Sequence, residues 1–230
     1  MIAVDLLLGA LISLVCGLDR VAILQIMISR PIVAAPLVAT LLGEPLTGLQ
    51  IGIMVELLWL ARLPVGAAVP PDDTQVAIAG TVLTIVLGHS LGASEPELMI
   101  LCLLIAIPLG KIGQYFDHYA RHYNVRLSQR VEAAFERGSL LVAELQHLRG
   151  LFSFSTAAVA TYVVIMLGGF IIVPFVWPLL QQPLQYSTGW LQLAFPLIGI
   201  AVILGTINVS RVITLFCASF CMAFLLMWLV

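Results

Sequence analysis

The stretch GIMVELLWLARLPVGAAVPPDDTQVAIAG, residues 52–80, decides the fold. It places one carboxylate, Glu56, inside an apolar run, and that run breaks at Pro64 and Gly66 before two adjacent carboxylates, Asp72 and Asp73. An ionisable side chain at membrane depth costs roughly 2.5–3.5 kcal/mol on insertion scales, so such residues in a membrane protein indicate a functional site. These carboxylates are therefore the first candidates for ligand contacts.

The composition is that of a membrane protein. Of the 230 residues, 61% are hydrophobic and only 10% are charged, whereas soluble domains carry about 25% charged residues. The formal net charge of −2 argues against a nucleic-acid partner, because phosphate contacts need clustered Lys and Arg. The first apolar run begins at Ile2, follows no basic residue and contains Asp5, so we expect a retained membrane segment rather than a cleaved signal peptide.

The two halves of the chain differ in the length of their apolar segments. Three C-terminal runs are long enough to span about 30 Å of hydrocarbon, namely 151–180, 191–209 and 212–230. Pro174 and Pro178 are expected to kink or end the first of them. Most N-terminal runs are shorter, and Gly or Pro separates several of them, at 21–28, 31–42, 46–61 and 76–87. Such interruptions are typical of broken or re-entrant segments around a polar cavity, with fusion into kinked, tilted helices as the alternative.

A polar section, 111–150, separates the two halves and holds six of the ten basic residues. The positive-inside rule places it in the cytoplasm. Apolar residues at helical spacing predict one amphipathic helix over 127–148, which would lie on the membrane surface or against a neighbouring subunit. A solvated connecting loop is the alternative. Gly48 and Gly52 have the spacing that lets two helices approach closely.

The fold expected from these features is all-α: a polytopic membrane protein with transmembrane helices, short re-entrant or broken helical segments in the N-terminal half, and a central amphipathic helix. We expect a single domain over 1–230. Within it, 1–110 holds the broken segments and the site, 111–150 is the polar connector, and 151–230 forms C-terminal transmembrane helices.

The polar residues within apolar runs are the candidate ligand contacts. Glu56 offers about four lone-pair sites and suits the hydroxyl groups of a sugar; the alternative is an internal salt bridge with Arg62 or Arg20. Asp72 and Asp73 follow Pro70-Pro71 and precede an apolar run, where an N-cap belongs, so one Asp can cap the helix while the other faces a ligand.

Asn208 and Gln25 are further candidates for substrate contact. For Asn208 the alternative is a hydrogen bond between helices. The sequence contains no GxSxG, HExxH, P-loop or GxGxxG motif, and its His residues lack metal-ligand spacing. We therefore expect no catalytic residues, no cofactor and no metal.

Several short motifs occur in an order and spacing that resemble a known family. They are SRPIV (29–33), LGE (42–44), GLQIG (48–52), VEL (55–57), PVGAAVPPD (64–72) and GHS (88–90). This pattern resembles the mannose-type enzyme IIC permeases, members of the mannose/fructose/sorbose family of the bacterial phosphoenolpyruvate-dependent sugar phosphotransferase system. INVSR (207–211) resembles a family segment in the C-terminal half.

The resemblance implies a permease subunit in the bacterial inner membrane that binds a hexose and passes it inward. It also implies a membrane partner, enzyme IID, a trimer of such pairs, and a cytoplasmic IIAB component that phosphorylates the sugar. Carried over by position, Glu56 and the region of Asp72 would contact the sugar, with Asn208 behind them. Mannose members have Asn where Pro64 stands and acidic residues where Leu24 and Gln25 stand, so the sugar is not identified.

Two other classes of function remain open at this point. One is a membrane receptor or regulator linked to the phosphotransferase system that does not transport. The other is an ion-coupled secondary transporter in which Glu56 and the two Asp residues bind protons or sodium.

Overall fold

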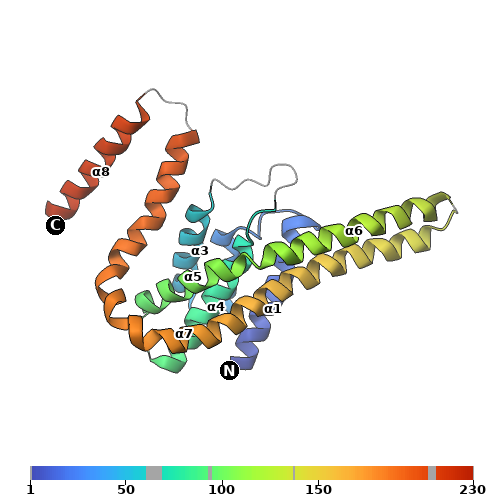
Figure 1. Cartoon of the computed structure of the whole chain (residues 1–230), viewed down its shortest axis with the longest axis horizontal. Coiled ribbons are helices and arrows are strands. Elements are labelled where there is room, and N and C mark those ends of the chain that lie inside the picture. Colours follow the sequence, from blue (N-terminus) through green and yellow to red (C-terminus); the bar gives the residue numbers. More distant parts are fainter. Residues whose placement is uncertain (1, 61–68, 93–94, 137, 207–210, 230) are drawn as a thin grey trace.

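The computed structural model describes residues 2–60, 69–92, 95–136, 138–206 and 211–229. Within these ranges the chain is helical and has no strands, so the predicted all-α class is confirmed. Figure 1 shows the helices, which are α1 (Ile2–Val21), α2 (Pro31–Leu41), α3 (Pro45–Leu58), α4 (Asp73–Leu91), α5 (Glu95–Gly110), α6 (Gly113–Glu136), α7 (Leu140–Thr206) and α8 (Val212–Leu229). In the described part, four helical stretches are long and apolar enough to cross a membrane.

Helix α4 forms the centre of the fold. Every residue from 74 to 87 is buried, and α1, α2, α3, α5 and α7 all pack against it. A helix that is apolar on all sides is expected to be surrounded in this way. The prediction of a short run at 76–87 was wrong, because the cap at Asp72 and the left-handed Gly92 (φ 57°) bound a helix of 19 residues, which is long enough to span.

Helices α2 and α3 form a short antiparallel hairpin. Pro31 and Pro45 each stand in the first turn of their helix, where the missing N–H needs no partner, and Gly43 (φ 86°) makes the turn between them. With 11 and 14 residues, they are about 17 and 21 Å long, shorter than the roughly 30 Å of hydrocarbon. The expectation of short, broken helices in this half is confirmed.

The close approach expected at the two hairpin glycines is also confirmed. A Cβ at Gly48 would lie 2.3 Å from the Cβ of Ala39, and one at Gly52 would lie 2.7 Å from the carbonyl oxygen of Pro31. Contacts this short leave no room for a side chain, so both glycines are required by the packing of α3 against α2.

The polar section is a helical hairpin, and the single helix predicted over 127–148 was wrong. Helix α6 ends at Glu136, Gly138 is left-handed (φ 68°), and α7 begins at Leu140. The Ser139 N–H donates to the carbonyl of Ala134 at 3.0 Å, which is typical of a glycine-terminated helix. Figure 1 shows the hairpin reaching away from the other helices. The apolar stripe is therefore divided between two antiparallel helices.

Helix α7 joins segments that the sequence suggested were separate. It runs for 67 residues with Pro174, Pro178, Pro183 and Pro196 inside it. Pro174 and Pro178 do not end the helix; Figure 1 shows α7 bending in its orange part instead, as proline kinks do. Beyond this bend α7 and α8 expose many large apolar side chains, as expected of helices that face lipid.

Candidate functional site

The two carboxylates that open α4 have separate roles. Asp72 is the N-cap, and its side chain accepts the Gln75 N–H at 3.1 Å, so the predicted cap is confirmed. Asp73 is the first residue of the helix, and its carboxylate accepts the Thr74 N–H at 3.0 Å. Negative charge at a helix N-terminus is favourable because the unpaired N–H groups and the helix dipole both attract it.

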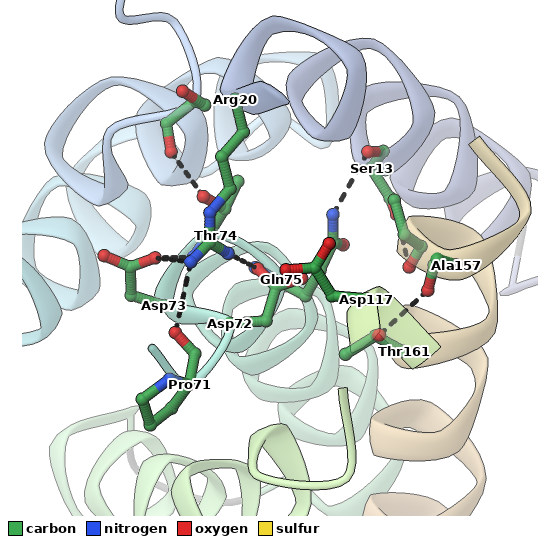
Figure 2. Close-up of polar contacts among 12 residues, drawn as sticks. Ser13, Arg20, Pro71, Asp72, Asp73, Thr74, Gln75, Asp117, Ala157 and Thr161 are labelled. Carbon is green, nitrogen blue, oxygen red and sulfur yellow. Dashed lines mark hydrogen bonds and ion pairs between the residues drawn. The ribbon is translucent and has the colours of Figure 1, made fainter. Parts of the chain in front are cut away.

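Arg20, at the end of α1, joins α1 to the start of α4. Its guanidinium forms an ion pair with Asp72, lies 3.4 Å from the nearer oxygen of Asp73, and donates to the carbonyl of Pro71 at 3.3 Å (Figure 2). A cation in the last turn of a helix interacts favourably with the carbonyl end of that helix. The sequence suggested Arg20 as a possible partner of Glu56, but did not predict its contacts with Asp72 and Asp73.

Asp19 organises the loop between α1 and α2. It is buried, with 4% of its surface exposed, and its carboxylate accepts N–H groups from Ile26 at 2.9 Å and Ser29 at 3.0 Å. From the other side, the Thr74 hydroxyl donates to the carbonyl of Ser29 at 2.7 Å. Two hydrogen bonds, one to Asp19 of α1 and one from Thr74 of α4, therefore fix the position of Ser29, the residue before Arg30.

The middle of this loop has an uncommon backbone. Leu24, Gln25 and Met27 are left-handed, with φ of 59°, 53° and 68°, a conformation that costs a non-glycine residue roughly 1–2 kcal/mol. Gln25 is exposed. The run at 21–28 that the sequence marked as apolar is thus a compact loop rather than a helix.

Glu56 lies on α3 at the base of the hairpin. Its carboxylate forms an ion pair with Arg30, and its second oxygen lies 3.5 Å from the N–H of Ile32 in the first turn of α2. The glutamate side chain is 11% exposed, whereas that of Arg30 is 47% exposed. Of the partners suggested by the sequence, Arg20 instead pairs with the two Asp residues, and Arg62 lies outside the described residues. Arg30 was not foreseen.

These elements enclose a pocket of about 180 Å³. Its polar lining comes from α1, the α1–α2 loop, α3 and the start of α4: Arg20, Ser29, Arg30, Glu56, Asp73 and Thr74. Its apolar lining includes Trp59 and Leu60, just after α3, and Pro70. The pocket can offer carboxylate acceptors, guanidinium donors and an indole ring to one small ligand.

The pocket brings together two of the five predicted contact residues, Glu56 and Asp73. Asp72 lies behind Asp73 as the cap and partner of Arg20, and neither Asp72 nor Gln25 lines the pocket. Asn208 and Pro64 lie outside the described residues. Ser29, Arg30, Trp59 and Thr74 were not predicted to line the site, and Arg20 was considered only as a salt-bridge partner of Glu56; the available signal was that these residues flank the ends of helices. Within the described ranges, no group of three or more His, Cys, Asp or Glu residues could hold a metal ion.

Comparison with protein families gives one match that covers almost the whole chain. The model described as the phosphotransferase system (PTS) sorbose-specific IIC component matches residues 3–229. Such coverage includes the pocket and every helix described above.

Individual relatives point in the same direction. The PTS mannose-specific EIIC component of Escherichia coli (strain K12) is 32% identical over 123 residues, which are 54% of this chain and 43% of that protein. The PTS sorbose-specific EIIC component of Klebsiella pneumoniae is 26% identical over 194 residues, which are 83% of this chain and 69% of that protein. The match to the first relative thus spans less than half of its length.

A solved structure shares the fold. It is described as the cryoEM structure of the mannose transporter ManYZ in complex with microcin E492, and the matched chain gives a TM-score of 0.60 at 22% identity. The match covers 96% of this chain and 86% of the other. At this identity the likeness concerns the fold alone.

Proposed function

Because this chain belongs to the family of sorbose-specific IIC components of the phosphotransferase system, we propose that it is a sugar permease subunit that binds one hexose in the pocket between α1, α3 and α4. The observation that carries the proposal is the convergence of Glu56, Asp73 and Arg30 on one cavity of about 180 Å³. Ligand pockets usually measure about 300–1,000 Å³, so a cavity of this size favours a small ligand such as a single monosaccharide.

The chemistry of the lining suits a polyol. Sugar hydroxyl groups both donate and accept hydrogen bonds, and the pocket offers carboxylate acceptors beside guanidinium donors. A carboxylate has about four lone-pair sites, so Glu56 can accept from a hydroxyl group while it keeps the ion pair with Arg30. Trp59 adds an apolar ring on which the C–H face of a sugar can pack.

Transport would follow from movement of the hairpin formed by α2 and α3. Its helices are short, and at the site the ion pair between Glu56 and Arg30 joins α3 to the loop before α2, so the hairpin can shift as a unit to expose the sugar on either side. We propose alternating access of this kind, in the inner membrane of a bacterium.

The remaining components belong to the same proposal. Enzyme IID would be the membrane partner, in a trimer of IIC–IID pairs, and a cytoplasmic IIAB component would phosphorylate the sugar. The phosphoryl chemistry would then lie entirely on other subunits.

Glu56→Gln tests the site directly. Labelled hexoses would be titrated into the protein purified with its IID subunit, and the dissociation constant compared with wild type. Hydrogen bonds to a charged group contribute about 1.5–3 kcal/mol, so we expect affinity to fall roughly 10- to 100-fold. Glu44→Gln is the matched control, because Glu44 lies at the opposite end of α3 and outside the pocket. Equal affinity in wild type and Glu56→Gln would refute the site.

Uptake into vesicles separates this function from the two alternatives. A permease of this system takes up sugar when phosphoenolpyruvate and the cytoplasmic components are supplied. Uptake that follows the membrane potential instead would identify an ion-coupled transporter. Sugar binding without uptake under either condition would identify a receptor.

A further inference from the structure

A groove between α6 and α7 is distinct from the sugar pocket. It measures about 400 Å³ and is lined by aromatic side chains of both helices, among them Phe116, Tyr119, Tyr123 and Phe152. Tyr119 and Phe152 are largely exposed, at 75% and 70%. The groove includes small residues, such as Ala160, which leave space between the aromatic walls.

The groove has a cationic end and an apolar end. Helices α6 and α7 are antiparallel: Asn124 donates to the carbonyl of Gly150 at 3.4 Å, whereas Gly113 packs against Thr161. Arg149 lines the groove at the Asn124 end. Ala160 lies eleven residues further along α7, about 16 Å from Arg149 at 1.5 Å per residue.

A second arginine stands at the same end. Arg126 follows Asn124 by two residues and lines an adjoining hollow of about 370 Å³, which shares Tyr119 and Tyr123 with the groove. The two arginines therefore flank the same pair of tyrosines. This arrangement concentrates positive charge at one end of a groove whose other lining residues are uncharged.

No acidic residue of the described chain lines either hollow. Asp117, on the same helix, is paired with Arg121 at 3.1 Å. Arg149 donates to the neutral oxygen of Gln146 at 3.4 Å, and among the ion pairs of the described residues none involves Arg126 or Arg149. Their charge is thus not neutralised by a carboxylate.

The two ends of the groove lie in parts of the chain that differ in polarity. Residues 111–150 hold most of the basic residues, whereas from Leu151 onward α7 is apolar enough to span a membrane. Arg149 stands at this boundary, and Ala160 lies within the apolar part. Tyrosine side chains are enriched where a membrane meets water. The cationic end therefore corresponds to the headgroup level and the other end to the hydrocarbon.

We propose that this groove binds one anionic phospholipid, with its phosphate between Arg126 and Arg149 and an acyl chain lying between Phe116 and Phe152 toward Ala160. Arginine suits a phosphate because its planar guanidinium can donate two parallel hydrogen bonds. The tyrosine hydroxyl groups supply further donors at the same level. Binding would hold the hairpin of α6 and α7 at the membrane surface.

Native mass spectrometry of the purified chain tests the proposal. Phosphatidylglycerol and phosphatidylcholine with identical acyl chains are titrated separately, and the bound lipid is counted. A basic residue near an anionic lipid surface contributes about fivefold in affinity. We therefore expect phosphatidylglycerol to be preferred, and Arg126→Gln and Arg149→Gln each to reduce its affinity about fivefold. Arg130→Gln, an exposed residue one turn beyond Arg126 that lines neither hollow, is expected to bind like wild type.

A second pair of variants tests the apolar end. Ala160→Leu fills the groove and is expected to weaken phosphatidylglycerol binding several-fold. Ala201→Leu makes the same replacement at an exposed position of α7 outside the groove and is expected to have no effect. Equal affinity of wild type for the two lipids would overturn the proposal, as would equal losses in Arg130→Gln and Arg149→Gln. A changed oligomeric mass in these variants with unchanged lipid affinity would identify a subunit contact and would also overturn it.

The lipid measurement is independent of the sugar site. Glu56→Gln is expected to leave lipid binding unchanged, so either proposal can fail without the other.

Discussion

Gly52→Ala is the most informative single change in the hairpin, because it inserts one methyl group between backbone atoms. The new Cβ would lie 2.7 Å from the carbonyl oxygen of Pro31 and 3.1 Å from the Cα of Ile32. Ordinary van der Waals contacts begin at 3.4 Å, so the first contact is short by 3.4 − 2.7 = 0.7 Å. Backbone atoms cannot rotate away as a side chain does, and the first turn of α2 must therefore move as a unit.

The expected energy follows from two opposing effects. Overpacking of this kind costs about 1–3 kcal/mol, whereas replacing glycine by alanine within a helix gains up to about 1 kcal/mol. Gly189→Ala shows the second effect alone, since it makes the same replacement within α7 where no atom lies within 4 Å. The difference between the two variants therefore isolates the cost of overpacking. Gly52→Ala should thus be about 1–3 kcal/mol less stable than Gly189→Ala.

The same shift should weaken sugar binding. The N–H of Ile32 already lies 3.5 Å from the carboxylate of Glu56, at the outer limit of a hydrogen bond, and Pro31 lines the pocket. We expect affinity to fall about tenfold, the effect of losing roughly one hydrogen bond. Sugar affinity of Gly189→Ala should equal that of wild type.

Thermal unfolding of the two purified variants, followed by tryptophan fluorescence, measures the difference in stability. About 2–4 °C per kcal/mol is expected for a chain of this size. Identical melting temperatures for Gly52→Ala and Gly189→Ala would show that α2 and α3 are not packed through Gly52. That result would refute the geometry of the hairpin, and with it the position of Glu56 beside Arg30.

Two further predictions concern the polar contacts around the site. Asp19→Ala leaves the N–H groups of Ile26 and Ser29 without an acceptor, and each N–H group that stays buried costs about 1–3 kcal/mol. Amide hydrogen exchange in residues 22–30 should therefore accelerate. Unchanged exchange would show that Asp19 does not hold the loop. Asp72→Asn keeps the cap but removes the charge that faces Arg20, whereas Asp72→Ala removes both. The alanine variant should therefore unfold about 1 kcal/mol more easily than the asparagine variant, and equal stability would show that the cap contributes nothing.

The sequence predicted the helix cap at Asp72, but it did not predict which arginine pairs with which carboxylate at the site. Pro31, Pro45 and Asp72 act locally, through a fixed φ, a missing N–H or a short polar side chain, and the chain does start helices at these positions. The ion pairs act over distance in sequence: Glu56 pairs with Arg30, 26 residues away, whereas Arg20 pairs with Asp72 and Asp73. Only the packing of α2 against α3 selects that partner.

The helical spacing of the apolar residues also gave a wrong prediction at Gly138, because the spacing continues across the end of one helix into the next. The apolar spacing over 127–148 fits one helix, yet Gly138 adopts a left-handed conformation and the two halves fold back on each other. The opposite error occurred in α7, which the prolines suggested was at least two segments. A proline removes one hydrogen bond and bends a helix, but neighbouring turns continue, and the described helix runs unbroken from Leu140 to Thr206.

The arginines of the two ion pairs at the site differ in their number of partners and in their exposure. This difference distinguishes a structural carboxylate from one that faces the ligand. Arg20 is held by Asp72, Asp73 and the carbonyl of Pro71, and its side chain is 23% exposed. The guanidinium of Arg30 has Glu56 as its one ion-pair partner among the described residues, and its side chain is 47% exposed. A ligand that enters the pocket perturbs the more exposed contact at lower cost, because exposed ion pairs contribute at most about 1 kcal/mol. The difference in exposure favours Glu56 over Asp72 as the carboxylate that accepts from a sugar hydroxyl group, and leaves Asp72 to fix α1 against α4.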